Sequence, residues 1–189
     1  MSLADRIGIG KRELISIVGA GGKSTILFTL GRDLATPSGR VILTTTTKMA
    51  EDQITEPTCW SDDPANVEEA LEPGRPLFVA IGRVPGKITG PTPENVDRLF
   101  LETTADHILV EADGARSMSI KAPAHHEPAI PGASTTVIVV AAIDAIGSPI
   151  SEVAHRPELV AKIAGTGPGD PLTIEGAARV LLHPNGGMK

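Results

Sequence analysis

A short glycine-rich stretch, VGAGGKST at residues 18–25, combines the residue types that bind phosphate groups. It follows an apolar run and precedes an amphipathic one, so its amides fall at the start of a predicted helix, where unpaired N–H groups and the helix dipole favour an anion. Lys23 adds a positive charge for a β- or γ-phosphate, and the Ser24 hydroxyl is placed to bind Mg²⁺. The residues expected to contact a nucleotide here are Gly19, Ala20, Gly21, Gly22, Lys23, Ser24 and Thr25.

The stretch departs from the full phosphate-loop pattern in one position. That pattern has a glycine six residues before the lysine, and this chain has Ile17 there, still inside the apolar run. The sequence therefore predicts a shortened phosphate loop, with an ordinary glycine turn before a helix as the alternative.

Two carboxylates close another apolar run far along the chain. The stretch HILVEADG, residues 107–114, carries Glu111 and Asp113 at its carboxyl end. Residues two apart on an extended chain point to the same side, and parallel α/β sheets bind ligands outside the carboxyl ends of their strands. We therefore expect both carboxylates near Ser24, where they bind Mg²⁺ or orient an attacking water, unless they are merely solvated. The predicted catalytic residues are Lys23, Glu111 and Asp113, and the predicted metal ligands are Ser24, Glu111 and Asp113.

The glycines also begin a dinucleotide-binding pattern, G-x-G-x-x-G, from Gly19. Its third glycine is replaced by Ser24, and the second predicted strand ends in TTTTK instead of the acidic residue that binds a ribose. Both departures favour a nucleoside triphosphate over a nicotinamide cofactor.

The runs around these residues alternate between strands and amphipathic helices. Continuous apolar strands are typical of a buried parallel sheet, and their alternation with helices predicts a three-layer α/β/α sandwich with a mainly parallel sheet. Strands are predicted at residues 14–18, 40–45, 76–82, 107–114 and 135–143, and helices at 24–34, 66–71 and 94–104.

The remaining segments complete the predicted organisation. Residues 82–95, rich in Gly and Pro, are expected to form a long loop with a functional role. From about residue 148 the strand signal gives way to helices predicted at 156–165 and 171–182. We expect a single domain over residues 1–189, with a helical C-terminal part.

Polar residues after the other strands extend the candidate site. The second strand ends with Thr46, Thr47 and Lys48, which would bind phosphate, metal-bound water or a second substrate, unless they only complete a strand. Arg116 and Lys121 follow the acidic strand end, where they would bind a second anionic group; a solvated loop explains them equally well.

Two histidine-containing stretches supply the last candidates. Adjacent histidines on an extended chain, as in HHEP at residues 125–128, point to opposite sides and rarely share an ion, so a zinc site is not expected. His126 and Glu127 remain candidate site residues. Arg156, at the start of a predicted helix, either approaches phosphates as an arginine finger does or has a capping role.

Composition excludes other classes of protein. The net charge is −6 without a basic block, and the chain has no Tyr, one Trp and three Phe, which argues against a nucleic-acid-binding surface. The single cysteine, Cys59, rules out an internal disulfide and fits a reducing compartment. No apolar stretch approaches the roughly 18 residues of a membrane span, and no secretory signal is recognisable. We expect a cytoplasmic protein without nucleic-acid or membrane partners.

These motifs resemble those of known families. The loop G-x-x-G-K-S-T is similar to that of the Mur ligases and folylpolyglutamate synthase, in which a glutamate after an apolar strand binds Mg²⁺, a role that Glu111 would match. More extensively, VGAGGKST, TTTTKM, EADGARSMSIKAPAHHEPAIP and HRPEL resemble, in this order, the selenium-dependent hydroxylase accessory proteins of the YqeC family. That resemblance implies a nucleotide-binding accessory role in the maturation of selenium-dependent molybdenum hydroxylases.

The sequence thus predicts a P-loop NTPase-like fold that binds Mg²⁺ and a nucleoside triphosphate. Both ATP and GTP stay open as the nucleotide, because the sequence has no N-K-x-D motif, which recognises the guanine base. Three interpretations stay open. The chain is an accessory protein that hydrolyses its nucleotide, a small-molecule kinase or Mur-like ligase, or a non-catalytic nucleotide-binding module. For the first, the expected partner is a molybdenum hydroxylase or one of its maturation proteins.

Overall fold

The computed structural model describes residues 2–189, which form two compact units. Each unit is assembled from three separate stretches of the chain. Unit 1 comprises the residues up to 17, residues 24–112 and residues 129–137, and unit 2 comprises residues 18–23, 113–128 and 138–189. The glycine-rich stretch is therefore divided, with Lys23 in unit 2 and Ser24 in unit 1.

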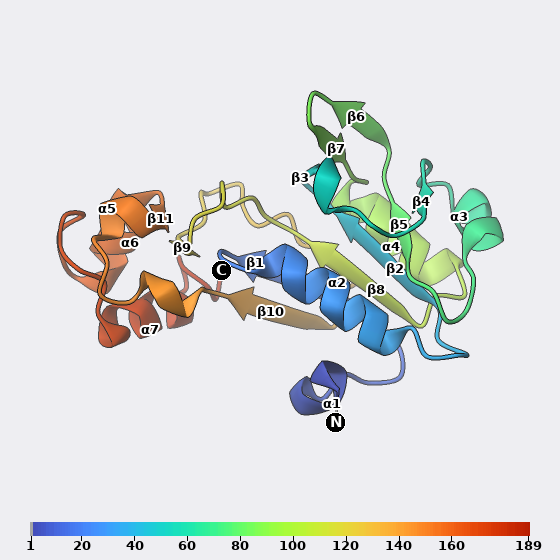
Figure 1. Cartoon of the computed structure of the whole chain (residues 1–189), viewed down its shortest axis with the longest axis horizontal. Helices are drawn as coiled ribbons and strands as arrows, with labels where there is room; N and C mark the ends of the chain where they lie inside the picture. The colour runs from blue at the N-terminus through green and yellow to red at the C-terminus, as the bar shows by residue number, and fades with distance from the viewer. Residues whose placement is uncertain (1) are drawn as a thin grey trace. The chain divides into compact units, whose positions relative to one another are not determined.

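A mainly parallel sheet of six strands, in the order β10-β1-β8-β2-β5-β4, is the centre of the fold (Figure 1). Strand β8 lies between β1 and β2 and is parallel to both. Its last residue, Glu111, is in register with Ile17 of β1 and Thr45 of β2, so β8 and β2 end together and β1 continues two residues further, to Gly19. The six strands are β1 (Glu13–Gly19), β2 (Val41–Thr45), β4 (Thr58–Cys59), β5 (Leu77–Val79), β8 (His107–Glu111) and β10 (Thr136–Val140).

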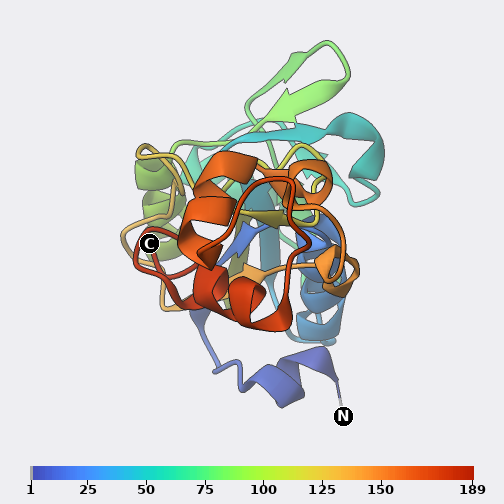
Figure 2. The same cartoon turned by 90° about the vertical axis from the view of Figure 1, so that its left-hand side faces the viewer.

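Helices cover both faces of this sheet, which confirms the predicted three-layer arrangement. Helix α2 (Lys23–Leu34) lies on one face and α4 (Pro93–Glu102) on the other (Figures 1 and 2). Helix α4 begins where the Thr92 hydroxyl accepts a hydrogen bond from the Asn95 amide, a common N-terminal cap. A third helix, α3 (Pro64–Ala70), is capped in the same way by Asp63, and a short helix α1 (Leu3–Ile7) precedes the sheet.

The core of unit 1 explains why the strands are continuous apolar runs. Strands β2 and β8 are buried along their whole length, as expected for strands with helices on both faces. Helix α2 approaches the sheet closely at Gly31, where an added Cβ would lie 2.6 Å from a Leu43 methyl carbon. The rings of Phe28 and Phe78 stack there with centroids 6.2 Å apart.

Residues 82–90 form a β-hairpin, so the prediction of a long irregular loop at 82–95 was wrong. Strands β6 (Gly82–Val84) and β7 (Lys87–Thr89) pair with each other, and β7 also pairs with β3 (Lys48–Ala50) in a three-stranded antiparallel sheet. The Pro and Gly that suggested a loop make the tight turn instead, with Gly86 at φ 69°.

Unit 2 has its own small core and contains the helices predicted after residue 148. Strands β9 (Ile120–Lys121) and β11 (Ala154–His155) pair in parallel. Helices α5 (Ile150–Val153), α6 (Pro157–Ala164) and α7 (Ile174–Leu182) follow. Two 3-10 helices complete the elements of the fold: Glu51–Gln53 in unit 1 and Ile143–Ala145 in unit 2. The buried side chains of this core include Ile120, Ile150, Val160, Leu172 and Val180.

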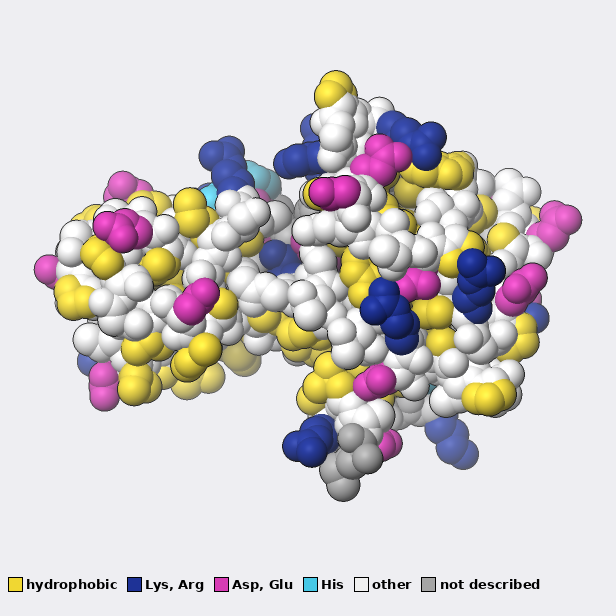
Figure 3. Space-filling model, in the orientation of Figure 1, with side chains coloured by type: hydrophobic (Ala, Val, Ile, Leu, Met, Phe, Trp, Pro, Cys, Tyr) yellow, Lys and Arg dark blue, Asp and Glu magenta, His cyan; other side chains and the backbone are white. Residues whose placement is uncertain are grey.

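On the face drawn in Figure 3, acidic and basic side chains are interspersed. None of the helices within residues 2–189 has the length and apolar character needed to cross a bilayer.

Candidate functional site

The predicted phosphate loop joins the end of β1 to the start of α2. Gly19, Gly21 and Gly22 have φ values of 98°, 65° and 101°, in the left-handed region that favours glycine. The Gly19 amide donates to Asp113 Oδ2 at 3.0 Å, and the Ala20 amide donates to the Val140 carbonyl at 2.8 Å. The Gly21 and Gly22 amides precede α2, and the amides from Lys23 onward belong to its first turn, where no acceptor exists within the helix.

Packing holds this loop on one side and leaves it open on the other. A Cβ on Gly19 would lie 2.2 Å from the Val140 carbonyl oxygen, and one on Gly21 would lie 2.4 Å from Ala142 Cβ. A Cβ on Gly22 would meet nothing within 4 Å, and Gly22 itself is exposed. An anion therefore has access to the loop at Gly22.

In unit 1, the structure brings Ser24 and Glu111 together, as the sequence predicts. The Ser24 hydroxyl donates to Glu111 Oε2 at 2.8 Å, although 87 positions separate the two residues in the chain. Glu111 is 8% exposed at the end of β8, the central strand of the parallel set. A hydroxyl beside a carboxylate fits Mg²⁺, which prefers oxygen ligands and takes one or two carboxylates together with phosphate and water. Ser24 and Glu111 are thus the residues that could hold this metal.

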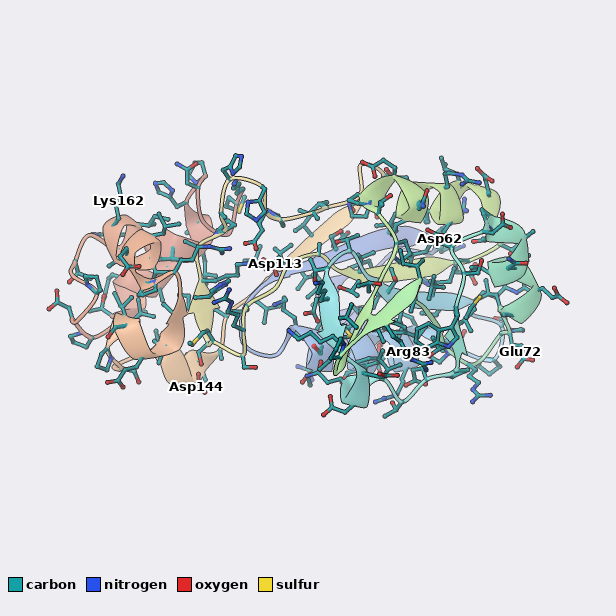
Figure 4. The ribbon with its side chains drawn as sticks, turned by 90° about the horizontal axis from the view of Figure 1, so that it is seen from above. Asp62, Glu72, Arg83, Asp113, Asp144 and Lys162 are labelled. Atoms are coloured by element: carbon teal, nitrogen blue, oxygen red, sulfur yellow. The ribbon has the colours of Figure 1, made fainter. Side chains whose placement is uncertain are left out.

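In unit 2, Asp113, which is labelled in Figure 4, contacts two lysines and an amide. Its Oδ1 lies 3.3 Å from Lys23 Nζ, and its Oδ2 lies 2.9 Å from Lys121 Nζ and accepts from the Gly19 amide. Lys23 also donates to the Gly19 carbonyl at 2.9 Å. Asp113 is 2% exposed, so these are contacts within the protein interior. Asp113 therefore has lysines as its partners within unit 2, and its role as a metal ligand stays a prediction.

The ion pairs continue from Lys121 to Arg156. Lys121 Nζ donates to Glu127 Oε2 at 2.9 Å and to the Gly114 carbonyl at 2.7 Å. Arg156 binds the same carboxylate with both terminal nitrogens, at 2.9 Å and 3.1 Å. Burial acts to raise the pKa of Glu127, but hydrogen bonds from Arg156 and Lys121 outweigh it and lower the pKa to about 2. Glu127 is therefore charged at neutral pH.

Glu127 was a candidate site residue beside His126, but the sequence did not predict its partners, Lys121 and Arg156. Glu127 is the single acidic residue within APAHHEPAIP, a stretch otherwise made of apolar residues, prolines and histidines, and this isolation is the sequence feature that indicates a basic partner. The structure also gives Arg156 an internal partner, since its guanidinium contacts Glu127 and the Ala122 carbonyl. The arginine-finger role of Arg156 stays a prediction.

The threonine hydroxyls at the end of β2 make hydrogen bonds within unit 1. The Thr45 hydroxyl donates to the Glu111 carbonyl at 2.8 Å, and the Thr46 hydroxyl donates to the Ala129 carbonyl at 2.7 Å. The Thr47 hydroxyl lies 3.2 Å from that of Thr45, and Lys48 is exposed on β3. These contacts favour the alternative that the threonines complete a strand end, and their ligand contacts stay predictions.

The remaining predicted residues lie on exposed positions. Residues 125 and 126 form a turn, so the His125 and His126 rings make an edge-to-face contact with centroids 5.5 Å apart. The expectation that they point to opposite sides of an extended chain was wrong. Arg116 is exposed at φ 50°, and Thr25 is exposed on α2. Within residues 2–189, no three His, Cys, Asp or Glu side chains are grouped so as to hold a metal ion.

A cavity of about 20 Å³ lies in unit 2, lined by Asp113 and Lys121 together with apolar residues such as Val140 and Leu181. This volume accommodates about one water molecule. It is too small for a nucleotide.

Comparisons with known proteins agree with the sequence resemblance. The model of a family described as YqeC protein matches residues 15–158. The Escherichia coli (strain K12) protein named Uncharacterized protein YqeC is 38% identical over 187 residues, which cover 97% of this chain and 73% of that protein. No solved structure matches the chain.

Proposed function

The chain belongs to the YqeC family, and we propose that it binds ATP or GTP together with Mg²⁺ and hydrolyses the nucleotide. The observation that carries this proposal is the 2.8 Å hydrogen bond between the Ser24 hydroxyl and Glu111, directly after a glycine-rich loop that opens a helix. A glycine turn without a ligand would not require a buried carboxylate beside the helix start.

Each part of the loop has a role in this proposal. The amides of residues 21–24 bind phosphate oxygens, and Lys23 neutralises their charge. Ser24 and Glu111 would hold Mg²⁺, which neutralises charge on the phosphates when bound. Glu111 also orients the water that attacks the terminal phosphorus, because its carboxylate lies at the end of β8, beside Ser24 at the start of α2.

The family resemblance supports the biological setting. It implies an accessory role in the maturation of selenium-dependent molybdenum hydroxylases. We therefore place nucleotide hydrolysis in that process, with a hydroxylase or one of its maturation proteins as the partner.

The test separates binding from turnover. Isothermal titration of the full chain with Mg-ATP and Mg-GTP measures affinity, and phosphate release measures hydrolysis. Glu111→Gln should bind nucleotide within a few-fold of wild type but lose at least tenfold in turnover, because the lost charge acts mainly in the transition state.

Other outcomes would contradict hydrolysis in specific ways. Turnover that requires an added small-molecule acceptor would identify a kinase or ligase. A wild-type chain that binds nucleotide and never releases phosphate, even with partners and acceptors present, would identify a binding module.

A further inference from the structure

A single buried carboxylate, Asp113, holds two lysines of unit 2. Its Oδ2 lies 2.9 Å from Lys121 Nζ, and its Oδ1 lies 3.3 Å from Lys23 Nζ. Asp113 is 2% exposed, and Oδ2 also accepts from the Gly19 amide. The carboxylate thus binds two donors of the proposed phosphate loop, the Lys23 ammonium and the Gly19 amide.

The two lysines are held differently. Lys121 is fixed within the unit, since its ammonium contacts Asp113, Glu127 and the Gly114 carbonyl at 2.7–2.9 Å. An ammonium has three donors, so a phosphate contact by Lys121 would break one of these bonds. Lys23 makes the longer contact to Asp113 and sits on the first residue of α2, where a phosphate would bind.

Binding of phosphate by Lys23 has a consequence for Asp113. When the Lys23 ammonium turns to the phosphate, its ion pair with Asp113 is weakened or broken, and the Asp113 carboxylate stays buried. A buried anion without a cationic partner is unfavourable. Unless another cation remains on Asp113, that penalty would oppose nucleotide binding.

We propose that Lys121 is a positioning residue that allows Lys23 to leave Asp113 for the phosphate. Lys121 keeps the Asp113 charge compensated in both states and does not contact the nucleotide itself. The Glu127 carboxylate, held by Arg156, keeps Lys121 in place at 2.9 Å. This inference rests on the proposed function, and it assigns to Lys121, Glu127 and Arg156 an indirect role in ligand binding.

A double-mutant cycle tests the proposal, with Mg-ATP titrated into the full chain. Lys121→Met should weaken binding at least tenfold, because Asp113 then retains Lys23. Asp113→Asn should bind several-fold tighter than wild type, because Lys23 then reaches the phosphate without leaving the Asp113 carboxylate. The double variant should return to within about threefold of wild type. Lys162→Met, on an exposed lysine of α6 (Figure 4), is the matched control and should change nothing.

The alternatives give different results. If Lys121 contacts the nucleotide, or supports the fold through contacts other than Asp113, adding Asp113→Asn will not restore affinity to Lys121→Met, and the proposal is overturned. If Lys121 only stabilises the fold through Asp113, Lys121→Met will lower the thermal unfolding temperature while its folded fraction binds Mg-ATP as wild type does, and this result also overturns the proposal. If Lys121→Met does not fold, Lys121→Gln is measured alone and combined with Asp113→Asn, with thermal unfolding as the check on folding, and restored affinity in the combination is again required.

Failure of the proposed function has a separate signature. A wild-type chain that does not bind Mg-ATP or Mg-GTP overturns both proposals at once. Wild-type binding that is lost in Lys121→Met and not restored in the double variant overturns this inference alone.

Discussion

The glycine-rich segments at residues 18–25 and 82–90 look alike in the sequence and differ in the structure. In the first, Gly21 and Gly22 both have positive φ, and a helix begins at the next residue. In the second, Gly86 makes the turn of a hairpin whose strands continue on both sides. Each segment has one lysine, but Lys23 is 5% exposed and paired with Asp113, whereas Lys87 is exposed.

The difference shows where binding chemistry originates. In a hairpin, the backbone amides on both sides of the glycine turn are used in hydrogen bonds between the two strands. Side chains also stabilise this hairpin: Arg83 pairs with Glu51 at 2.8 Å, and its guanidinium carbon lies 4.0 Å from the Trp60 ring centroid. A glycine turn before a helix directs several amides to one point and fixes a lysine beside them. The helix that follows, more than the glycines, distinguishes a candidate site from a turn.

The largest expected effects come from the glycines that lack room for a side chain, one in each segment. A Cβ on Gly19 would lie 2.2 Å from the Val140 carbonyl oxygen, and a Cβ on Gly90 would lie 1.7 Å from the Thr45 carbonyl oxygen. Gly19→Ala and Gly90→Ala should each lower the free energy of unfolding by about 3 kcal/mol or more, because the obstacle is backbone. Urea titration followed by circular dichroism measures this, and a loss below about 1 kcal/mol in either variant would contradict the close packing.

The matched lysines should differ in ligand binding. Lys23→Ala should weaken Mg-ATP binding by about 1.5–3 kcal/mol, roughly 10- to 150-fold, because a charge-assisted contact to phosphate is lost. Lys87→Ala should leave the dissociation constant within about twofold, since a solvated lysine contributes little. Isothermal titration measures both, and equal affinities of Lys23→Ala and wild type would show that the first segment is only a turn.

The smallest effect is expected at the open glycines. Gly22 and Gly86 have positive φ, and neither would bring a Cβ within 4 Å of other atoms. Alanine at either position should cost about 1–2 kcal/mol of stability from backbone strain alone. Only Gly22→Ala should also weaken Mg-ATP binding, because only there does the strained backbone direct amides at a ligand. Parallel unfolding and binding measurements check this, and a weaker affinity in Gly86→Ala would remove the distinction.

The elements predictable from the sequence are those with a long local pattern. The strands β2, β5, β8 and β10 lie within the predicted ranges, and β1 extends one residue beyond its range at each end. Strands β2, β5 and β8 are buried along their whole length, which gives them the continuous apolar runs that made them recognisable. Strands of two or three residues, such as β9 and β11, have no periodicity of their own. They form because the chain brings distant segments together, with Ile120 paired to Ala154.

The same distinction applies to the candidate site. The proximity of Ser24 and Glu111 was predictable, because both follow from strands that must end at one edge of a parallel sheet. The pairing of Glu127 with Arg156 was not predictable. It depends on the path of residues 113–128, in which Arg116 and Ser117 adopt left-handed conformations that their sequence does not demand.

The division of the chain has a genetic consequence. The polypeptide passes between unit 1 and unit 2 at residues 17/18, 23/24, 112/113, 128/129 and 137/138, so neither unit is encoded by a continuous part of the gene. A gene cut at any single one of these points interrupts at least one unit, and no single cut separates the two units from each other. Lys23 and Ser24 are encoded by adjacent codons although they belong to different units. The same is true of residues 112 and 113. Recombination at one point therefore cannot exchange one unit alone between relatives.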